Sequence, residues 1–178
     1  MTPGLLSTVR GAITDSGVDP RALCLEITES VVMEHPERAA EVLRALRELG
    51  VRVAIDDFGT GHSSLGSLRR FPVDILKIDR SFVAGLGVCP EDRAVVDAIV
   101  ALAHVLGFTI VAEGVETGAQ LEQLLEAGCD SGQGFYWCPA VSRHTFTARL
   151  TDQRIGALLP RRPPQRELTA GSRLPTTA

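Results

Sequence analysis

Acidic side chains and one lysine recur at the ends of short apolar runs in this 178-residue sequence. Adjacent carboxylates repel each other, so a positively charged partner is expected close to any pair of them. One such residue at the end of a strand is ordinary, but the same pattern on four successive runs predicts a shared site. The residues are Glu26 in LEITES, Asp56 and Asp57 in VRVAIDD, Lys77 and Asp79 in VDILKID, and Glu113 in IVAEG.

Lys77 is the only lysine in a chain that otherwise takes its positive charge from seventeen arginines. An ammonium group is compact and can lose its proton, whereas a guanidinium group effectively cannot. The position of Lys77 among the acids therefore favours a chemical role, such as holding or deprotonating a water molecule. A structural ion pair with a neighbouring carboxylate is the alternative.

The chemistry that suits this set of residues is metal-dependent. Clustered carboxylates are neutralised by hard divalent cations, and sites rich in oxygen suit Mg²⁺ or Mn²⁺. Adjacent carboxylates can hold two metals about 3.5–4 Å apart, the arrangement used for in-line phosphoryl displacement. Barrel enzymes of the enolase type also combine acids that bind Mg²⁺ with a lysine base, and they remain a rival at this point.

The elements that must position these residues alternate along the chain. Apolar, β-branched runs predict strands near 22–28, 52–57, 74–79, 108–113 and 129–133. Helical periodicity and capping residues predict helices at 3–17, 35–50, 62–71, 89–107, 117–128 and 142–155. Such alternation predicts an α/β fold with a parallel sheet, and in a β/α barrel the active site lies at the C-terminal ends of the strands.

Composition narrows the classes of function. The net charge is −4, and residues 154–178 contain five arginines and one glutamate, so the remainder is distinctly acidic. An acidic body argues against binding of a nucleic acid polymer.

Four cysteines without metal-ligand spacing indicate free thiols in a reducing compartment, and we expect a cytoplasmic protein without a signal peptide or membrane span. Residues 1–153 are expected to form one domain and 154–178 a disordered tail rich in Pro and Arg.

Five motifs in order resemble the signatures of EAL domains, which are bacterial cyclic di-GMP phosphodiesterases. They are LEITES, AIDDFGTGHSSL, LKIDRSFV, IVAEGVET and GQGFYWCP, within roughly residues 5 to 150. The resemblance implies a (β/α)8 barrel of the TIM type. It also implies metal-dependent hydrolysis of cyclic di-GMP to linear pGpG in second-messenger signalling, with Mg²⁺ or Mn²⁺ in a two-metal site.

The same resemblance implies a role for each motif residue. Glu26 and Glu113 are expected to bind metal, Asp56 to bridge two metals and Asp57 to bind the second. Lys77 would hold or deprotonate the attacking water, and Glu113 could also assist as a base. Supporting roles are implied for three further acids and a glutamine: Glu29 would steady the loop after Asp57, Glu116 would support Glu113, Asp79 would contact substrate, and Gln133 would line the catalytic site.

The front of the sequence departs from the family pattern. The Glu-Ala-Leu motif that supplies one metal ligand is absent ahead of Glu26, and the chain contains no asparagine, the residue that supplies another. We therefore expect the first two strands of the barrel to be missing, two metal ligands to be lacking, and the sequence upstream of Met1 to encode them.

Because two metal ligands are missing, the sequence leaves one main prediction of function and two alternatives. The chain is predicted to be a cyclic di-GMP phosphodiesterase domain that is inactive or weak in this form. The alternatives are a catalytically degenerate EAL module that binds or acts as a scaffold, and a truncated product without function. Expected partners are cyclic di-GMP, a second copy through the loop FGTGHSS at 58–64, and attached or separate GGDEF or sensory domains.

Overall fold

The computed structural model describes residues 4–60 and 68–151, which fall into two compact units, 1–139 and 140–178. The second unit contains one described helix, α8 (Arg143–Thr151). The tail predicted at 154–178 and most of the helix predicted at 62–71 lie outside the described residues. None of the described helices is long and apolar enough to cross a membrane. The four cysteines are free thiols, as predicted.

The first unit alternates strands and helices. Its strands are β1 (Cys24–Thr28), β2 (Arg52–Phe58), β3 (Ile75–Ile78), β4 (Thr109–Ala112) and β5 (Ser131–Gly132). Its helices are α1 (Leu5–Ser16), the 3₁₀ turn η1 (Pro20–Ala22), α2 (Glu29–Glu34), α3 (Pro36–Glu48), α5 (Arg80–Ala84), α6 (Pro90–Leu106) and α7 (Gly118–Ala127). All five predicted strands are confirmed.

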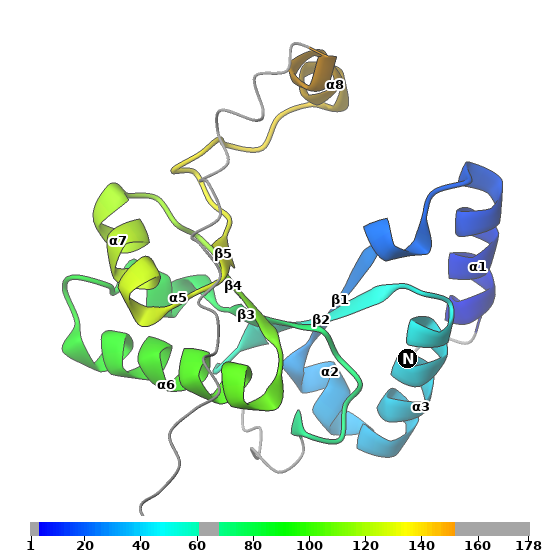
Figure 1. The fold of residues 1–178 in the computed structure, drawn as a ribbon, viewed down its shortest axis with the longest axis horizontal. Helices are drawn as coiled ribbons and strands as arrows, with labels where there is room; N and C mark the ends of the chain where they lie inside the picture. Colours follow the sequence, from blue (N-terminus) through cyan, green and yellow to red (C-terminus); the bar gives the residue numbers. More distant parts are fainter. Residues whose placement is uncertain (1–3, 61–67, 152–178) are drawn as a thin grey trace, which may run out of the picture. The chain divides into compact units, whose positions relative to one another are not determined.

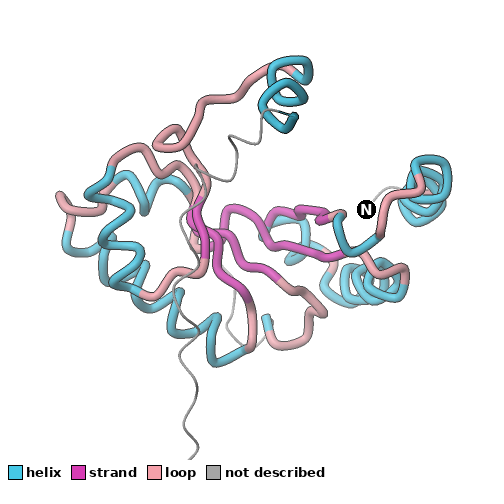
Figure 2. The backbone as a smooth tube through the Cα atoms, turned by 45° about the horizontal axis from the view of Figure 1, so that its top comes forward, coloured by secondary structure: helices cyan, strands magenta, loops and turns pink. Residues whose placement is uncertain are grey.

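The five strands form a single parallel sheet in the order β1-β2-β3-β4-β5. Figure 1 shows α2 and α3 beside β1 and β2, with α1 next to α3, and shows α5, α6 and α7 on the side of β3 to β5. Figure 2 shows the strands side by side as one twisted band. The predicted parallel α/β class is confirmed, but within the described residues the sheet is open and does not close into a barrel.

The two faces of the sheet differ in burial. Ile55, Leu76 and Ile110 are fully buried on the face that packs in the hydrophobic core with helix residues such as Leu43 of α3 and Val100 of α6. Alternation along a strand puts the neighbours of these residues on the opposite face. Burying one face against the helices therefore fixes which residues the other face presents, and these include the predicted site residues.

Short sequence signals explain where the long helices begin and end. Pro36 and Pro90 occupy the first helical positions of α3 and α6, where a missing N–H costs nothing. Thr117 and Gln120 form a capping box at the start of α7, and Gly128 ends that helix in the left-handed conformation. The short helices α2 and α5 were not predicted, because five or six residues cannot display a helical period.

Gly134 is the position where we expect substitution by alanine to damage the fold most directly. A Cβ atom built there would lie 2.1 Å from the backbone oxygen of Val115, and backbone cannot move aside as a side chain can. Gly134→Ala is therefore expected to lower the free energy of unfolding by more than about 2 kcal/mol in urea titrations.

Gly11 provides a matched control, because it lies inside α1 and an added Cβ would meet nothing within 4 Å. Gly11→Ala is expected to raise the free energy of unfolding by about 0.5–1 kcal/mol, since alanine favours helix more than glycine does. Equal stability of the two variants would contradict the importance of the contact at Gly134.

Candidate active site

The residues predicted to do chemistry converge at the C-terminal ends of the strands. Glu26 pairs in register with Ala54, and Ala54 pairs with Ile75, so these three side chains share one face of the sheet. Asp56 and Lys77 follow two residues later on their strands and point to that same face. Glu113 directly follows β4, and its N–H donates to the carbonyl of Ile78. Parallel pairing thus brings residues from four strands to one rim.

Lys77 lies at the centre of this rim. Its Nζ is 2.7 Å from Oε2 of Glu26 and 2.9 Å from Oδ1 of Asp56, and it also forms an ion pair with Oε1 of Glu113. The lysine side chain is only 4% exposed. Burial alone would lower its pKa, but the hydrogen bonds with Glu113, Glu26 and Asp56 outweigh burial and raise the pKa above its usual value. Lys77 is therefore an ammonium ion in this arrangement.

A β-bulge lets two adjacent aspartates face the same site. The register between β2 and β3 runs from Ile55–Leu76 to Phe58–Ile78, so Asp56 and Asp57 together oppose the single residue Lys77. In a regular strand, neighbouring side chains would point to opposite faces. Asp57 instead has a φ of 55°, in the left-handed region, and it is the only described non-glycine residue with a positive φ. The bulge is what turns both carboxylates toward the rim.

The carboxylates of Asp56, Asp57 and Glu113 have oxygens within 4.8 Å of one another, close enough to hold one metal ion. Burial raises the pKa of Asp57, and the negative charges of Asp56 and Asp79 raise it further. Hard oxygen donors crowded in this way fit Mg²⁺ or Mn²⁺. Five carboxylates against one ammonium give the group a formal charge of −4, which two divalent cations would neutralise; the five are Glu26, Asp56, Asp57, Asp79 and Glu113.

Gln133 and Asp79 are held differently around this cluster. The side-chain amide of Gln133 donates to Oε1 of Glu113 at 2.6 Å, so Gln133 fixes the orientation of that carboxylate. Asp79 caps α5 and accepts hydrogen bonds from the backbone and hydroxyl of Ser81. Burial raises the pKa of Asp79, but these bonds and the backbone N–H of Arg80 lower it overall. A role for Asp79 with substrate stays a prediction.

Glu116 lies apart from the acidic cluster. Its backbone N–H donates to the side chain of Gln120 at the start of α7. Within residues 4–60 and 68–151, no hydrogen bond or ion pair links the Glu116 carboxylate to Lys77, Glu113 or the aspartates. Any support that Glu116 gives to the site therefore stays a prediction as well.

Glu29 is a buried carboxylate below the rim, with 2% of its surface exposed. Its Oε2 accepts a hydrogen bond from the N–H of Gly59, two residues after Asp57. The contact ties α2 to the loop that follows the aspartate pair. The sequence placed Glu29 in this supporting position, but gave no indication that its partner would be a backbone N–H.

Removing the Glu29 carboxylate is expected to loosen the loop after Asp57. Glu29→Ala removes the charged acceptor of the Gly59 N–H, and because hydrogen bonds to charged groups contribute about 1.5–3 kcal/mol, the variant should lose stability of that order. Glu29→Gln keeps an acceptor oxygen and should cost less. Amide hydrogen exchange at Gly59 checks the local effect, and urea unfolding checks the global one. The exposed Glu34 on the same helix is the control, and Glu34→Ala should change stability by no more than about 0.5 kcal/mol.

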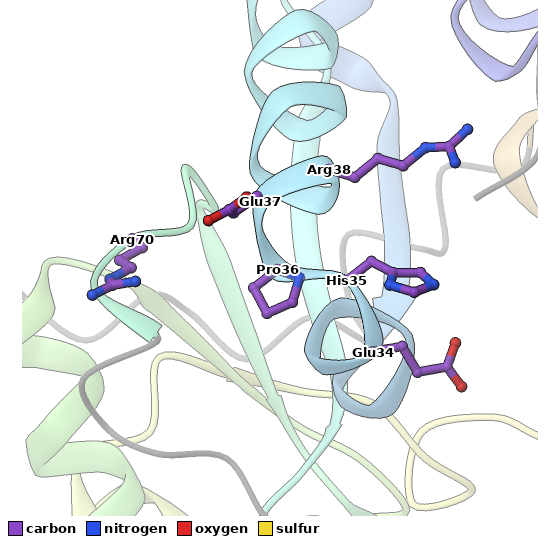
Figure 3. A pocket seen from close by; sticks show the side chains of 6 residues that line it. All are labelled: Glu34, His35, Pro36, Glu37, Arg38 and Arg70. Carbon is purple, nitrogen blue, oxygen red and sulfur yellow. The ribbon is translucent and has the colours of Figure 1, made fainter.

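A separate hollow of about 480 Å³ lies at the junction of α2 and α3. Figure 3 shows that its labelled side chains come from the helix junction and from Arg70. They are Glu34, His35, Pro36, Glu37, Arg38 and Arg70. None of them belongs to the acidic cluster, so the largest concentration of chemically useful groups lies on the strand rim and not in this hollow.

The part of the chain that matches a known protein family coincides with the first compact unit. The EAL domain family matches residues 1–140. The bifunctional diguanylate cyclase/cyclic di-GMP phosphodiesterase MucR of Pseudomonas aeruginosa is 48% identical over 132 residues, which are 74% of this chain and 19% of MucR. The chain spans 16% to 25% of the length of eight curated relatives that it matches.

Two solved structures are similar to most of this chain. The MucR phosphodiesterase in complex with cyclic di-GMP has a TM-score of 0.78 and 44% identity, and the match covers 81% of this chain and 58% of that one. The EAL domain of Mycobacterium smegmatis DcpA has a TM-score of 0.80 and 45% identity, covering 85% of this chain and 68% of the other.

Proposed function

The chain belongs to the EAL domain family, and from this premise we propose that it forms the catalytic part of a phosphodiesterase that hydrolyses cyclic di-GMP to linear pGpG. The observation that carries the proposal is the contact of one buried lysine, Lys77, with acids from three other strand ends. A fold alone does not imply an activity, but this arrangement of groups is what metal-dependent phosphoryl transfer needs.

We propose Mg²⁺ or Mn²⁺ as the cofactor, held by Asp56, Asp57 and Glu113 with Glu26 at the edge of the cluster. The support is the close approach of the carboxylate oxygens and the excess of negative charge around one ammonium. When bound, such cations supply Lewis-acid stabilisation of the phosphodiester and of the attacking oxygen. They would also let an acidic rim accept an anionic substrate.

The protein side chains then have distinct tasks. The Lys77 ammonium would donate a hydrogen bond to the attacking water once a bound cation takes over part of its contact with Asp56 or Glu113. Glu113 is the better candidate for accepting the proton, because its carboxylate lies beside Lys77 and is oriented by Gln133. The negative charge of Asp79 helps to raise the pKa of Asp57, and both carboxylates would border the substrate.

The alternative function is a binding or scaffold module that has lost hydrolysis. The observation in its favour is the absence of any asparagine, and of the Glu-Ala-Leu motif ahead of Glu26, which together would supply two metal ligands by resemblance. Against it stands the retained cluster around Lys77, because converging charges are costly to keep without a use.

The proposed setting is a larger signalling protein. MucR, whose name includes a diguanylate cyclase, is about five times longer than the matched region, so we propose that this chain acts beside a GGDEF or sensory domain in the cytoplasm. A second copy is a further proposed partner through the loop 58–64, of which residues 61–64 lie outside the described part of the chain.

Conversion of cyclic di-GMP to pGpG, followed by chromatography with Mg²⁺, Mn²⁺ or EDTA, tests the proposal. The assay compares the 178-residue chain with a chimera in which the part of the MucR EAL domain preceding the matched region is placed ahead of Met1. Turnover by the chimera that EDTA abolishes and Asp56→Asn removes would support the phosphodiesterase. A folded chimera that binds cyclic di-GMP without turnover would support the binding module.

A further inference from the structure

Lys77 has no hydrogen-bonding capacity to spare. An ammonium group has three N–H donors, and Nζ of Lys77 contacts three carboxylates, those of Glu26, Asp56 and Glu113. The side chain is buried to 96%. The lysine therefore occupies the electrostatic centre of the acidic cluster, where a positive charge is needed if the acids are to remain together.

Two of these three carboxylates also belong to the group that could hold a metal ion. Asp56 and Glu113 contact Lys77, and together with Asp57 they bring oxygens within 4.8 Å of one another. A cation bound among these oxygens would share two of its ligands with the ammonium and would be repelled by its charge. The ammonium and a divalent cation would therefore compete for the carboxylates of Asp56 and Glu113.

We propose that Lys77 is a built-in counter-ion: it holds the acidic cluster together when no metal is bound, and it limits metal affinity by competing for Asp56 and Glu113. This inference rests on the metal site of the proposed function, but it assigns Lys77 a task that is separate from water positioning. Metal binding then requires Lys77 to release part of its contact with one or both carboxylates. The metal-free chain keeps its rim in place at the cost of weaker metal binding.

The substitution Lys77→Met separates these two effects, because methionine keeps much of the apolar stem and removes the charge. Without metal, three carboxylates then converge with no counter-charge, so the unfolding midpoint should fall by at least about 5 °C in EDTA. With the repulsion gone, the Mn²⁺ concentration that gives half of the full metal-induced shift should fall at least about 10-fold relative to the unaltered chain. Lys77→Arg keeps a positive charge and should retain weak metal binding.

The measurement is thermal unfolding of the full 178-residue chain over a series of Mn²⁺ and Mg²⁺ concentrations, since a ligand that binds only the folded state raises the midpoint. The control is Arg47→Met. Arg47 forms a more exposed ion pair at 3.1 Å with Asp74, which precedes β3 at the opposite end of that strand. This variant should lose some stability in EDTA and keep the half-saturating Mn²⁺ concentration of the unaltered chain.

The outcomes distinguish the inference from the proposed function. The unaltered chain and Lys77→Met are compared first. If Mn²⁺ stabilises both with equal half-saturating concentrations, or if Lys77→Met binds Mn²⁺ more weakly, then Lys77 does not compete with the metal, and the proposed metal site stands. If neither protein responds to Mn²⁺ or Mg²⁺, the metal site itself is wrong and the inference falls with it. If Lys77→Met does not fold in EDTA, refolding on addition of Mn²⁺, followed by circular dichroism, supports the proposal, and failure to refold at any Mn²⁺ concentration overturns it. Lys77→Gln, which keeps one amide donor, provides the same comparison in a milder form.

Discussion

The 178-residue chain alone is expected to convert cyclic di-GMP at least about 100-fold more slowly than the MucR chimera. Loss of a residue that only supports a metal ligand lowers metal affinity or activity about 10- to 100-fold, and loss of the ligands themselves should lower it further. The retained acids come from β1, β2 and the end of β4, and resemblance to the family implies two further ligands that this chain does not contain. With one cation poorly held, the uncompensated carboxylates would repel the phosphates of the substrate.

Titration with Mn²⁺ should show whether the short chain is slow because it binds metal weakly or because its catalytic step is impaired. If the missing ligands are the cause, raising Mn²⁺ should recover part of the activity of the short chain, and the chimera should be saturated at lower Mn²⁺. A chimera carrying Leu43→Ala, which truncates a buried core side chain of α3, serves as a control for general loss of structure, because it should lose stability without changing its Mn²⁺ requirement specifically. Robust turnover by the short chain, abolished by EDTA, would show that the retained residues suffice.

The agreement between sequence and structure is best at the rim. Alternating strands and helices predicted a parallel sheet, and a parallel sheet brings the ends of its strands together, so the meeting of Glu26, Asp56, Lys77 and Glu113 could be anticipated without coordinates. The long helices were predictable for a similar reason, because Pro36, Pro90 and the Thr117 cap leave visible signals at their starts.

The local backbone at Asp57 could not be predicted in the same way. Strict alternation would have turned one of two adjacent aspartates away from the site, and only the register shift between β2 and β3 shows how both are used. Nothing in the letters DD indicates a bulge, since left-handed backbone is usually predicted from glycine. The sequence also could not show that all three N–H donors of Lys77 would contact carboxylates, because it predicts which charges lie near one another but not which hydrogen bonds they form.

Lys77→Arg in the chimera is expected to reduce turnover at least about 100-fold, in the range typical of a positioned group that assists proton transfer or holds the attacking water. The substitution preserves the positive charge, so long-range attraction of the substrate is unchanged. What changes is shape: a planar guanidinium is larger than an ammonium and cannot donate to three converging carboxylates from one point. Lys77 is only 4% exposed, which leaves little room for that larger group.

A change in turnover without a matching change in substrate binding is the result that this argument requires. Cyclic di-GMP affinity, measured by calorimetry in the same metal, should shift by less than about 10-fold, because the charge near the phosphates is kept. Arg47→Lys is the matched control, an exchange of the same two residue types at an ion pair with Asp74, and it should leave turnover unchanged. If Lys77→Arg hydrolyses cyclic di-GMP as fast as the unaltered chimera, positive charge alone is sufficient at this position, and the compact ammonium held between Glu26, Asp56 and Glu113 has no special part in the chemistry.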